Sequence, residues 1–211
     1  MSVLLIAEHD NSNLKVLTLN AINAASKIDS DIHVLVAGNK CESVSKEVAA
    51  VPLVKKVLQS ESANYENYLA ENLTPLVVKI AEKYTHIIAS ANTFGKNFMP
   101  RVAALLDISQ VSDIIKINSP DTFIRPIYAG NAFATIKTND KKKCITIRPT
   151  SFDPLQLLAV KHKLKKSKQQ IHQIFLSLLK KKKLNLKDQN SEQRELLFQE
   201  VEVCRVEIIL N

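Results

Sequence analysis

Glycine is scarce in this sequence. Only three glycines occur among 211 residues, at positions 38, 95 and 130, so none follows position 130. Neither GxGxxG nor GxxxxGK[ST] occurs in the chain. The common glycine-rich loops, whose backbone approaches a phosphate closely, are therefore excluded.

The side chains of catalytic and metal sites also lack the spacing that such sites need. Cys41, Cys144 and Cys204 lie far apart and form no CxxC pair, which favours isolated thiols in a reducing compartment. The five histidines (9, 33, 86, 162 and 172) form no HExxH motif, and there is no GxSxG. Asp29 and Asp31 are close in sequence but are typical of a charged face. We therefore expect no catalytic residue and no metal site.

Long hydrophobic runs are absent. No apolar run reaches the roughly 18 residues of a spanning helix, and no basic segment precedes a hydrophobic one. We expect no membrane insertion and no export. Met1 directly precedes the strand-like run SVLLIAE, which leaves no room for a transit peptide. We expect a cytoplasmic bacterial protein or, in a eukaryote, a mitochondrial matrix protein that has lost its presequence.

The positive charge is unevenly distributed. Of the net charge of +8, residues 1–150 contribute +3 (17 basic against 14 acidic) and residues 151–211 contribute +5 (12 against 7). The basic runs at 161–168 and 180–183 are accompanied by a single aromatic residue, Phe175. A single-strand binding surface needs stacking rings beside its cations. The pattern therefore argues against a specific nucleic-acid partner.

The first 120 residues alternate between short apolar runs and segments of helical period, which is typical of βαβ units. The expected strands are 2–8, 31–38, 54–59 and 86–91, and the expected helices are 14–25, 41–51 and 64–84, the last kinked or broken at Pro75. Residues 9–13 form a loop with candidate helix caps. A further helix follows residue 92, with Pro100 in its first turn. The pattern predicts a three-layer α/β/α parallel sheet, as in Rossmann-like and adenine nucleotide α-hydrolase-like folds.

From residue 111 the apolar period changes to two. Four runs, 112–118, 122–129, 132–138 and 143–148, are expected as strands because turn residues separate them. We expect these strands to extend the parallel sheet in antiparallel fashion.

The loop SANTFGKN (Ser90–Asn97) follows a buried strand at the edge where open α/β sheets bind ligands. Its single glycine, Gly95, is a weak phosphate signal. Lys96 and Arg101 beside it are candidates for holding an anion or a partner's carboxylate, while His86 is expected to be a hydrogen-bonded structural histidine. A free-standing nucleotide-binding protein that uses this loop is one interpretation of the chain.

Several blocks point to another interpretation. In order, they are SVLLIAEHDN, VLVAG, ENLTPLV, SANTFGKNFMPRVAALLDISQVSDI, SPDTFIRPIYAGNAFATIKT and RPTSFD. In order and spacing they resemble the α subunit of electron transfer flavoprotein over residues 2–153, and the GK…PRVAALL…SDI and RPIYAGNA blocks are highly specific.

The resemblance implies that residues 1–153 are the family's N-terminal α/β domain, which supports the flavin domain and packs against a β subunit that carries a structural AMP. The family is an electron carrier rather than an enzyme. Its FAD accepts electrons from acyl-CoA dehydrogenases of fatty acid β-oxidation and from other dehydrogenases. It passes them to a membrane quinone oxidoreductase of the respiratory chain.

The family pattern requires a glycine-rich FAD domain after Asp153, with the motifs RPEL and SGGRG, and neither motif is present in this chain. Both are permitted in another triplet phase. If the third base of each codon is joined to the first two of the next, residues 195–211 (ELLFQEVEVCRVEIILN) permit I-I-I-S-G-G-R-G-L-Q-S-G-D-N-F-K. In the same phase Lys187 to Ser191 permit R-P-E-L, and seven codons separate this motif from the serine of S-G-G-R-G. Residues 155–160 (LQLLAV) permit a linker of small residues.

We therefore expect residues 154–211 to be an out-of-frame remnant of the FAD domain, poorly ordered or helical, and the chain to be a truncated α subunit. In that case no residue of this chain contacts flavin. The alternative for the tail is a genuine amphipathic helix, such as 169–183, that binds a membrane or a partner.

Overall fold

The computed structural model describes residues 2–155 and, for its backbone, residues 205–210. The strands are β1 (Val3–Ile6), β2 (Ile32–Gly38), β3 (Val54–Glu61), β4 (His86–Ser90), β5 (Gln110–Ile114), β6 (Lys116–Ser119), β7 (Thr122–Ile127), β8 (Ala132–Lys137), β9 (Lys143–Ile147) and β10 (Arg205–Leu210). The helices are α1 (Val16–Ser26), α2 (Glu42–Ala49), α3 (Ala70–Ala81) and α4 (Thr93–Leu105). Three short 3-10 turns are η1 (Ala63–Tyr65), η2 (Tyr128–Gly130) and η3 (Pro149–Ser151).

A large sheet organises the fold. Its order is β10-β3-β2-β1-β4-β9-β5, and the six strands from β3 to β5 run parallel to one another. β1 lies in the middle, and all four of its side chains are at most 3% exposed. The near-continuous apolar run at the start of the chain is explained by this position, because a central parallel strand is buried on both faces.

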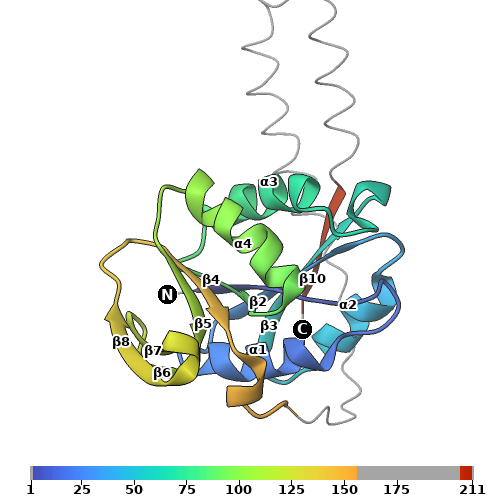
Figure 1. Ribbon diagram of the computed structural model, residues 1–211. Coiled ribbons are helices and arrows are strands. Elements are labelled where there is room, and N and C mark those ends of the chain that lie inside the picture. The colour runs from blue at the N-terminus through green and yellow to red at the C-terminus, as the bar shows by residue number, and fades with distance from the viewer. Residues whose placement is uncertain (1, 156–204, 211) are drawn as a thin grey trace, which may run out of the picture.

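Helices cover both faces of the large sheet (Figure 1). Side chains of β1 alternate between them: Val3 and Leu5 belong to the core beneath α1 and α2, whereas Leu4 and Ile6 belong to the core beneath α3 and α4. The expected three-layer α/β/α architecture is confirmed.

The second half of the sheet differs from the expectation in two respects. Residues 112–118, expected as one strand, are divided between β5 and β6 in different sheets. The chain bends at Asp113, which has a φ of 59° and a carboxylate held by the Arg148 guanidinium. Residues 143–148, expected to be antiparallel, form β9, which lies parallel between β4 and β5. Four of the five residues of β9 are buried, which suits an interior strand rather than an edge.

The antiparallel extension is a separate small sheet, β6-β7-β8, beside β5 (Figure 1). Its inner face packs on the core of α1 and α2 through the fully buried Phe123 and the partly buried Ile117 and Ile136. The predicted strands 122–129 and 132–138 are confirmed over 122–127 and 132–137. They are joined by η2, in which Tyr128, Ala129 and Gly130 all have positive φ (49°, 54° and 94°).

Three local predictions about helices are wrong. Pro100 lies inside α4, because the helix already begins at Thr93, and residues 93–97 of the expected Ser90–Asn97 loop are helical. The segment 64–84 is interrupted before α3 rather than at Pro75, which lies within that helix. The 9–13 loop supplies no cap, because α1 begins after Lys15 with no side-chain cap.

The segment after β9 is tied to α1. Asn20 Nδ2 donates to the carbonyl oxygens of Pro149 and Phe152 at 3.1 and 2.5 Å, and Asn23 Nδ2 donates to that of Asp153 at 2.8 Å. Phe152 is buried in the core of α1 and α2, and Leu155 packs against the same core. Residues 2–155 therefore share one packed structure.

The tail was expected to be poorly ordered or helical. At 205–210 this is wrong, because these residues form β10, which pairs antiparallel with β3 from Arg205 opposite Glu61 to Leu210 opposite Lys56. The helical expectation at 169–183 falls outside the described residues. Within the ranges 2–155 and 205–210, no helix has the length and apolar character needed to cross a membrane.

Candidate functional site

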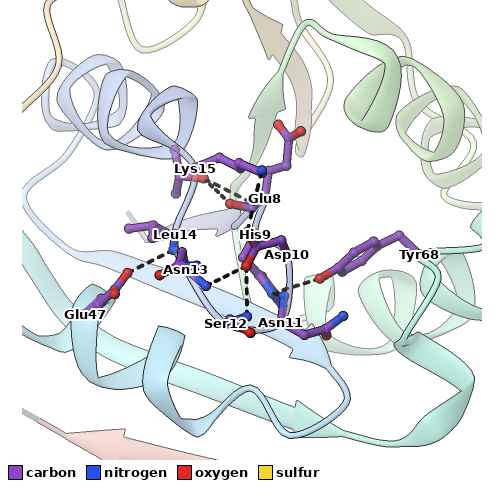
Figure 2. A network of polar contacts seen from close by, with 11 residues as sticks. Glu8, His9, Asp10, Asn11, Ser12, Asn13, Leu14, Lys15, Glu47 and Tyr68 are labelled. Carbon is purple, nitrogen blue, oxygen red and sulfur yellow. Dashed lines mark hydrogen bonds and ion pairs between the residues drawn. The ribbon is translucent and has the colours of Figure 1, made fainter.

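The carboxyl ends of β1, β2 and β4 meet at one edge of the large sheet, where open α/β sheets bind ligands. The loops that follow β1 and β4, together with the segment between η1 and α3, bring together Glu8, His9, Asn11, Tyr68 and Asn92, which we call the carboxyl-edge cluster. Figure 2 shows most of this cluster from close by, with the loop from Glu8 to Lys15 at its centre.

His9 is the buried centre of the cluster, with an exposed fraction of 2%. Its Nδ1 accepts hydrogen bonds from the Asn11 backbone N–H (3.1 Å) and the Tyr68 hydroxyl (2.9 Å), and the two rings meet edge to face at 5.2 Å (Figure 2). These two bonds assign Nδ1 as the acceptor and place the ring proton on Nε2.

Burial makes His9 a weak base. Desolvation lowers its pKa from 6.5 to about 4, although the Ala37 backbone and the Asp10 carboxylate act in the opposite direction. Its Nε2 forms no well-aligned hydrogen bond with any described residue. The ring is therefore neutral at neutral pH, and its two hydrogen bonds at Nδ1 hold the loop after β1 to Tyr68.

Asn11 connects three loops. Its side-chain oxygen accepts from the Asn39 N–H at 2.9 Å, and its Nδ2 donates to the Glu66 carbonyl at 3.1 Å. It has a φ of 67°, a left-handed conformation that asparagine tolerates better than most residues. Asp10 fixes the same loop by accepting from the backbone N–H groups of Ser12 and Asn13, which lowers the pKa of its carboxyl.

The start of α4, where the sequence placed a candidate phosphate site, is occupied by protein groups. Asn92 Oδ1 accepts the Gly95 N–H at 3.1 Å and thus caps the helix. Asn92 Nδ2 in turn donates to the Glu8 carboxylate. An incoming phosphate would meet a capped helix and a carboxylate, so these contacts weigh against an anion site in Ser90–Asn97.

Two of the three glycines are packed tightly against protein atoms. A Cβ on Gly38 would lie 2.3 Å from Asn11 Oδ1, and a Cβ on Gly95 would lie 2.0 Å from the Ser90 carbonyl oxygen. Both glycines are required for close packing within the chain, and neither leaves space for a pyrophosphate. Gly130 has open space around it but lies in η2, away from this edge.

Two of the other three sequence candidates, His86 and Arg101, make structural contacts. His86 is 1% exposed, and its two ring nitrogens lie 2.8 Å from the Pro120 carbonyl oxygen and 2.9 Å from the Thr85 hydroxyl, which confirms the structural histidine. Arg101 is paired with Glu71 at 2.7 Å rather than held ready for an anion. Lys96 is exposed on α4.

The network that closes this edge was missed by sequence reasoning. Glu8 and Asn92 are 84 positions apart, and His9 and Tyr68 are 59 apart, so no local spacing connects them. The available signal was a run of polar residues directly after a buried strand, which marks a loop but not its contacts. Among the described residues, no group of three or more histidine, cysteine, aspartate or glutamate side chains is placed to hold a metal ion.

Comparisons with known proteins agree on one family. The sequence model of the family described as "Electron transfer flavoprotein domain" matches residues 3–174. A Pseudomonas aeruginosa protein named electron transfer flavoprotein subunit alpha is 51% identical over 153 residues, which is 72% of this chain and 50% of that protein. A mitochondrial subunit alpha from Dictyostelium discoideum is 50% identical over 158 residues, covering 71% of this chain and 44% of its own length.

A subunit alpha from Paracoccus denitrificans is 47% identical over 154 residues, again 72% of this chain and 50% of the relative. This chain thus spans about half the length of the curated relatives that it matches.

Proposed function

Since the chain belongs to the electron transfer flavoprotein family as an α subunit, we propose that it is a truncated form that retains the scaffold domain and has lost the FAD domain. Residues 1–153 are the scaffold, and residues 154–211 are the out-of-frame remnant. The observation that carries this proposal is that the motifs of the family's flavin domain are absent from residues 154–211 but are permitted there in another triplet phase. The identity of about 50% to the relatives extends over some 153 residues of this chain.

The triplet phase of the tail supports the second half of the proposal. The shifted phase permits R-P-E-L and S-G-G-R-G in the order and separation that resemble the family's flavin domain, whereas the protein sequence contains neither. Two motifs at the expected separation are difficult to obtain by chance. The same origin explains why the last part of the chain contains no glycine.

The described residues do not fit FAD. The space next to Gly38 and Gly95 is filled by protein atoms, and the Glu8 carboxylate lies beside the capped start of α4. A flavin nucleotide needs close backbone approach and positive or hydrogen-donating groups at its pyrophosphate. We therefore propose that this chain carries no electrons itself.

The remaining role is assembly. At the family level, the complete protein accepts electrons on FAD from acyl-CoA dehydrogenases and passes them to a quinone oxidoreductase, and its β subunit holds an AMP. We propose that this chain can bind the β subunit without contributing redox chemistry, in the cytoplasm of a bacterium or the mitochondrial matrix of a eukaryote.

The strand β10 is compatible with an out-of-frame tail. An edge strand offers a row of unpaired backbone N–H and C=O groups that a strand of unrelated origin can satisfy. The segment 205–210 (RVEIIL) is rich in β-branched residues, so its pairing with β3 requires no selected side-chain contact.

The rival function is a free-standing nucleotide-binding protein that uses Ser90–Asn97. Its support is the position of this segment at the ligand-binding edge of the sheet. The capped start of α4 and the neighbouring Glu8 carboxylate favour the scaffold instead.

The test is purification of the full chain alongside a matched variant in which one base near codon 155 restores the other phase. We expect the chain to show no flavin absorbance and the restored variant to be yellow. Flavin on the unmodified chain would refute the loss of the FAD domain. AMP bound to the unmodified chain would favour the nucleotide-binding function.

A further inference from the structure

We infer that the C-terminal strand β10 is an internal cap on β3, and that this cap keeps a second copy of the chain from pairing with the same edge. The inference goes beyond the proposed function, because it concerns the backbone of β3 and holds whatever the origin of the tail. The contact that carries it is the antiparallel pairing of β10 with β3 over six consecutive residues. Figure 1 shows β10 in red at this end of the large sheet.

Without β10, β3 would be the outermost strand of the parallel part of the sheet. Its partner on the inner side is β2, which pairs with it as far as Gly38 opposite Glu61. Every second backbone N–H and C=O of β3 points away from β2 and would lack a partner in the protein. Such a row of groups is a template for the next strand that approaches it.

The opposite edge of the sheet is protected in a way that β3 is not. β5 bends at Asp113, and just beyond it the Ile115 N–H donates to the Ile124 carbonyl of β7 at 2.8 Å, so the small sheet continues beside it. β3 (VKKVLQSE) contains no proline, and its charged residues lie only toward its two ends. Its four central residues, 57–60, are uncharged. Sheets blunt their edges with bends, proline, charges or a covering element, so β3 depends on the strand that covers it.

The edge of β3 is self-complementary, which makes a second copy the natural competitor of β10. In the cap, Arg205 lies opposite Glu61. If two copies paired antiparallel with Leu58 of one opposite Gln59 of the other, Lys56 of each would lie opposite Glu61 of its partner. Both occupants therefore bring a basic residue opposite Glu61, and opposite charges across a strand pair are favourable.

Covering this edge has a cost that any occupant must offset. With β10 in place, Gln59 and Ser60 are 1% and 0% exposed, and their side-chain oxygens have no hydrogen-bond partner among the described residues. Water would satisfy these oxygens on an open edge. Because β10 belongs to the same chain, its pairing does not weaken on dilution, whereas the pairing of two copies does. We therefore expect the intact cap to prevail and a broken cap to be replaced by a second chain.

The first test traps the cap in the full chain by disulfide formation. Two double variants, Ser60→Cys with Val206→Cys and Gln59→Cys with Glu207→Cys, join residues that lie directly opposite each other. All variants carry Cys204→Ser, which removes the cysteine next to β10. The matched control, Ser60→Cys with Glu207→Cys, is one position out of register. Mild oxidation should cross-link at least one in-register pair within a single chain, and failure of both refutes the cap. A control that cross-links equally well refutes its register.

The second test breaks the cap with proline and measures self-association by analytical ultracentrifugation. Neighbouring residues of an antiparallel edge strand alternate between bonding the partner strand and facing solvent, and proline is tolerated only where the N–H faces solvent. Ile208→Pro and Ile209→Pro in the full chain are therefore matched controls for each other. We expect the wild type to be a monomer. One proline variant should associate roughly tenfold or more tightly than the wild type, and the other should behave like the wild type.

Each remaining outcome is decisive. Two proline variants that stay monomeric refute the role of β10 against self-association, and two that associate equally refute the antiparallel ladder. A wild-type dimer that persists after cross-linking of the cap also refutes that role. If the proline variants precipitate, hydrogen exchange of β3 in the wild type decides, because the cap requires slow exchange of the N–H groups that point away from β2. The proposed function is tested separately, by flavin absorbance, which none of these variants changes.

Discussion

Acidification is expected to weaken the fold through His9. The pKa of this ring is lowered from 6.5 to about 4 in the folded chain, chiefly because burial disfavours its charged form. Between these two values the unfolded chain binds the proton more tightly than the folded chain does. The contribution of His9 to stability is therefore complete above about pH 6.5 and is lost progressively as the pH falls toward 4.

The magnitude follows from the size of the shift. Each pKa unit corresponds to about 1.4 kcal/mol, so the full loss is about 3 kcal/mol and the loss at pH 5 is about 2 kcal/mol. A typical domain has only about 5–15 kcal/mol of stability in total. The main structural cause is desolvation of the charged ring in its buried position. Protonation of Nδ1 also ends its acceptance of hydrogen bonds from Asn11 and Tyr68.

The assay is urea unfolding of the wild type and of His9→Asn, monitored by circular dichroism at pH 7.5 and at pH 5.0. Burial also lowers the pKa values of His33 and His86, and these contributions cancel in the comparison because both proteins retain them. We expect the wild type to lose about 2 kcal/mol more than the variant on acidification. Equal losses would show that His9 is not the buried neutral base described above.

Three further predictions concern packing and the chain's boundary. Asn20→Ala removes the side-chain donor to two backbone carbonyls near η3, of which that of Pro149 keeps the Phe152 N–H, and should cost about 1–3 kcal/mol in urea unfolding; an unchanged midpoint would contradict the contact. Gly95→Ala places a methyl 2.0 Å from the Ser90 carbonyl oxygen and should destabilise by at least ~2 kcal/mol, whereas a variant that melts with the wild type would show that the strand end can relax. Limited trypsin digestion should leave a stable core ending near Lys161, the first lysine or arginine after the packed residues 2–155, because Arg148 precedes Pro149 and the proposed out-of-frame tail was not selected to pack; a protected fragment that reaches Arg205 would contradict this.

The interior strands of the large sheet could be predicted from the sequence, because strands buried on both faces are apolar throughout. β1, β2 and β4 are apolar on both faces, and this pattern alone identifies them as interior parallel strands. The position of β9 could not be predicted, because periodicity shows that a strand exists but not which strands it pairs with. The bend at Asp113 could not be predicted for a related reason: it depends on contacts with Arg148 and Thr146, which are more than thirty residues away in the sequence.

The carboxyl edge shows the same limit. The sequence identified the right end of the sheet, because the Ser90–Asn97 segment follows a buried strand. It gave no sign that Asn92 caps α4 and bonds to Glu8, since that pairing is made only when β1 and β4 lie side by side. Local sequence patterns predicted which end of the sheet carries the polar residues. Contacts between residues far apart in the sequence determined which hydrogen bonds those residues make.

The family resemblance reached further than local patterns in one respect. The sequence blocks within residues 2–153 were sufficient to indicate an α subunit, and the family match and the relatives agree. Our proposal for residues 154–211 rests on their triplet phase, and a test of it therefore requires the nucleotide sequence.

The most direct measurement is therefore the nucleotide sequence of codons 150–211. The account predicts that the phase starting one base earlier is open from about codon 155 and encodes R-P-E-L and then S-G-G-R-G. For codons 198–202 this requires the third bases T, G, G, A or C, and G, in that order. Stop codons in that phase, or other third bases at these five positions, would contradict the loss of the FAD domain by a change of frame.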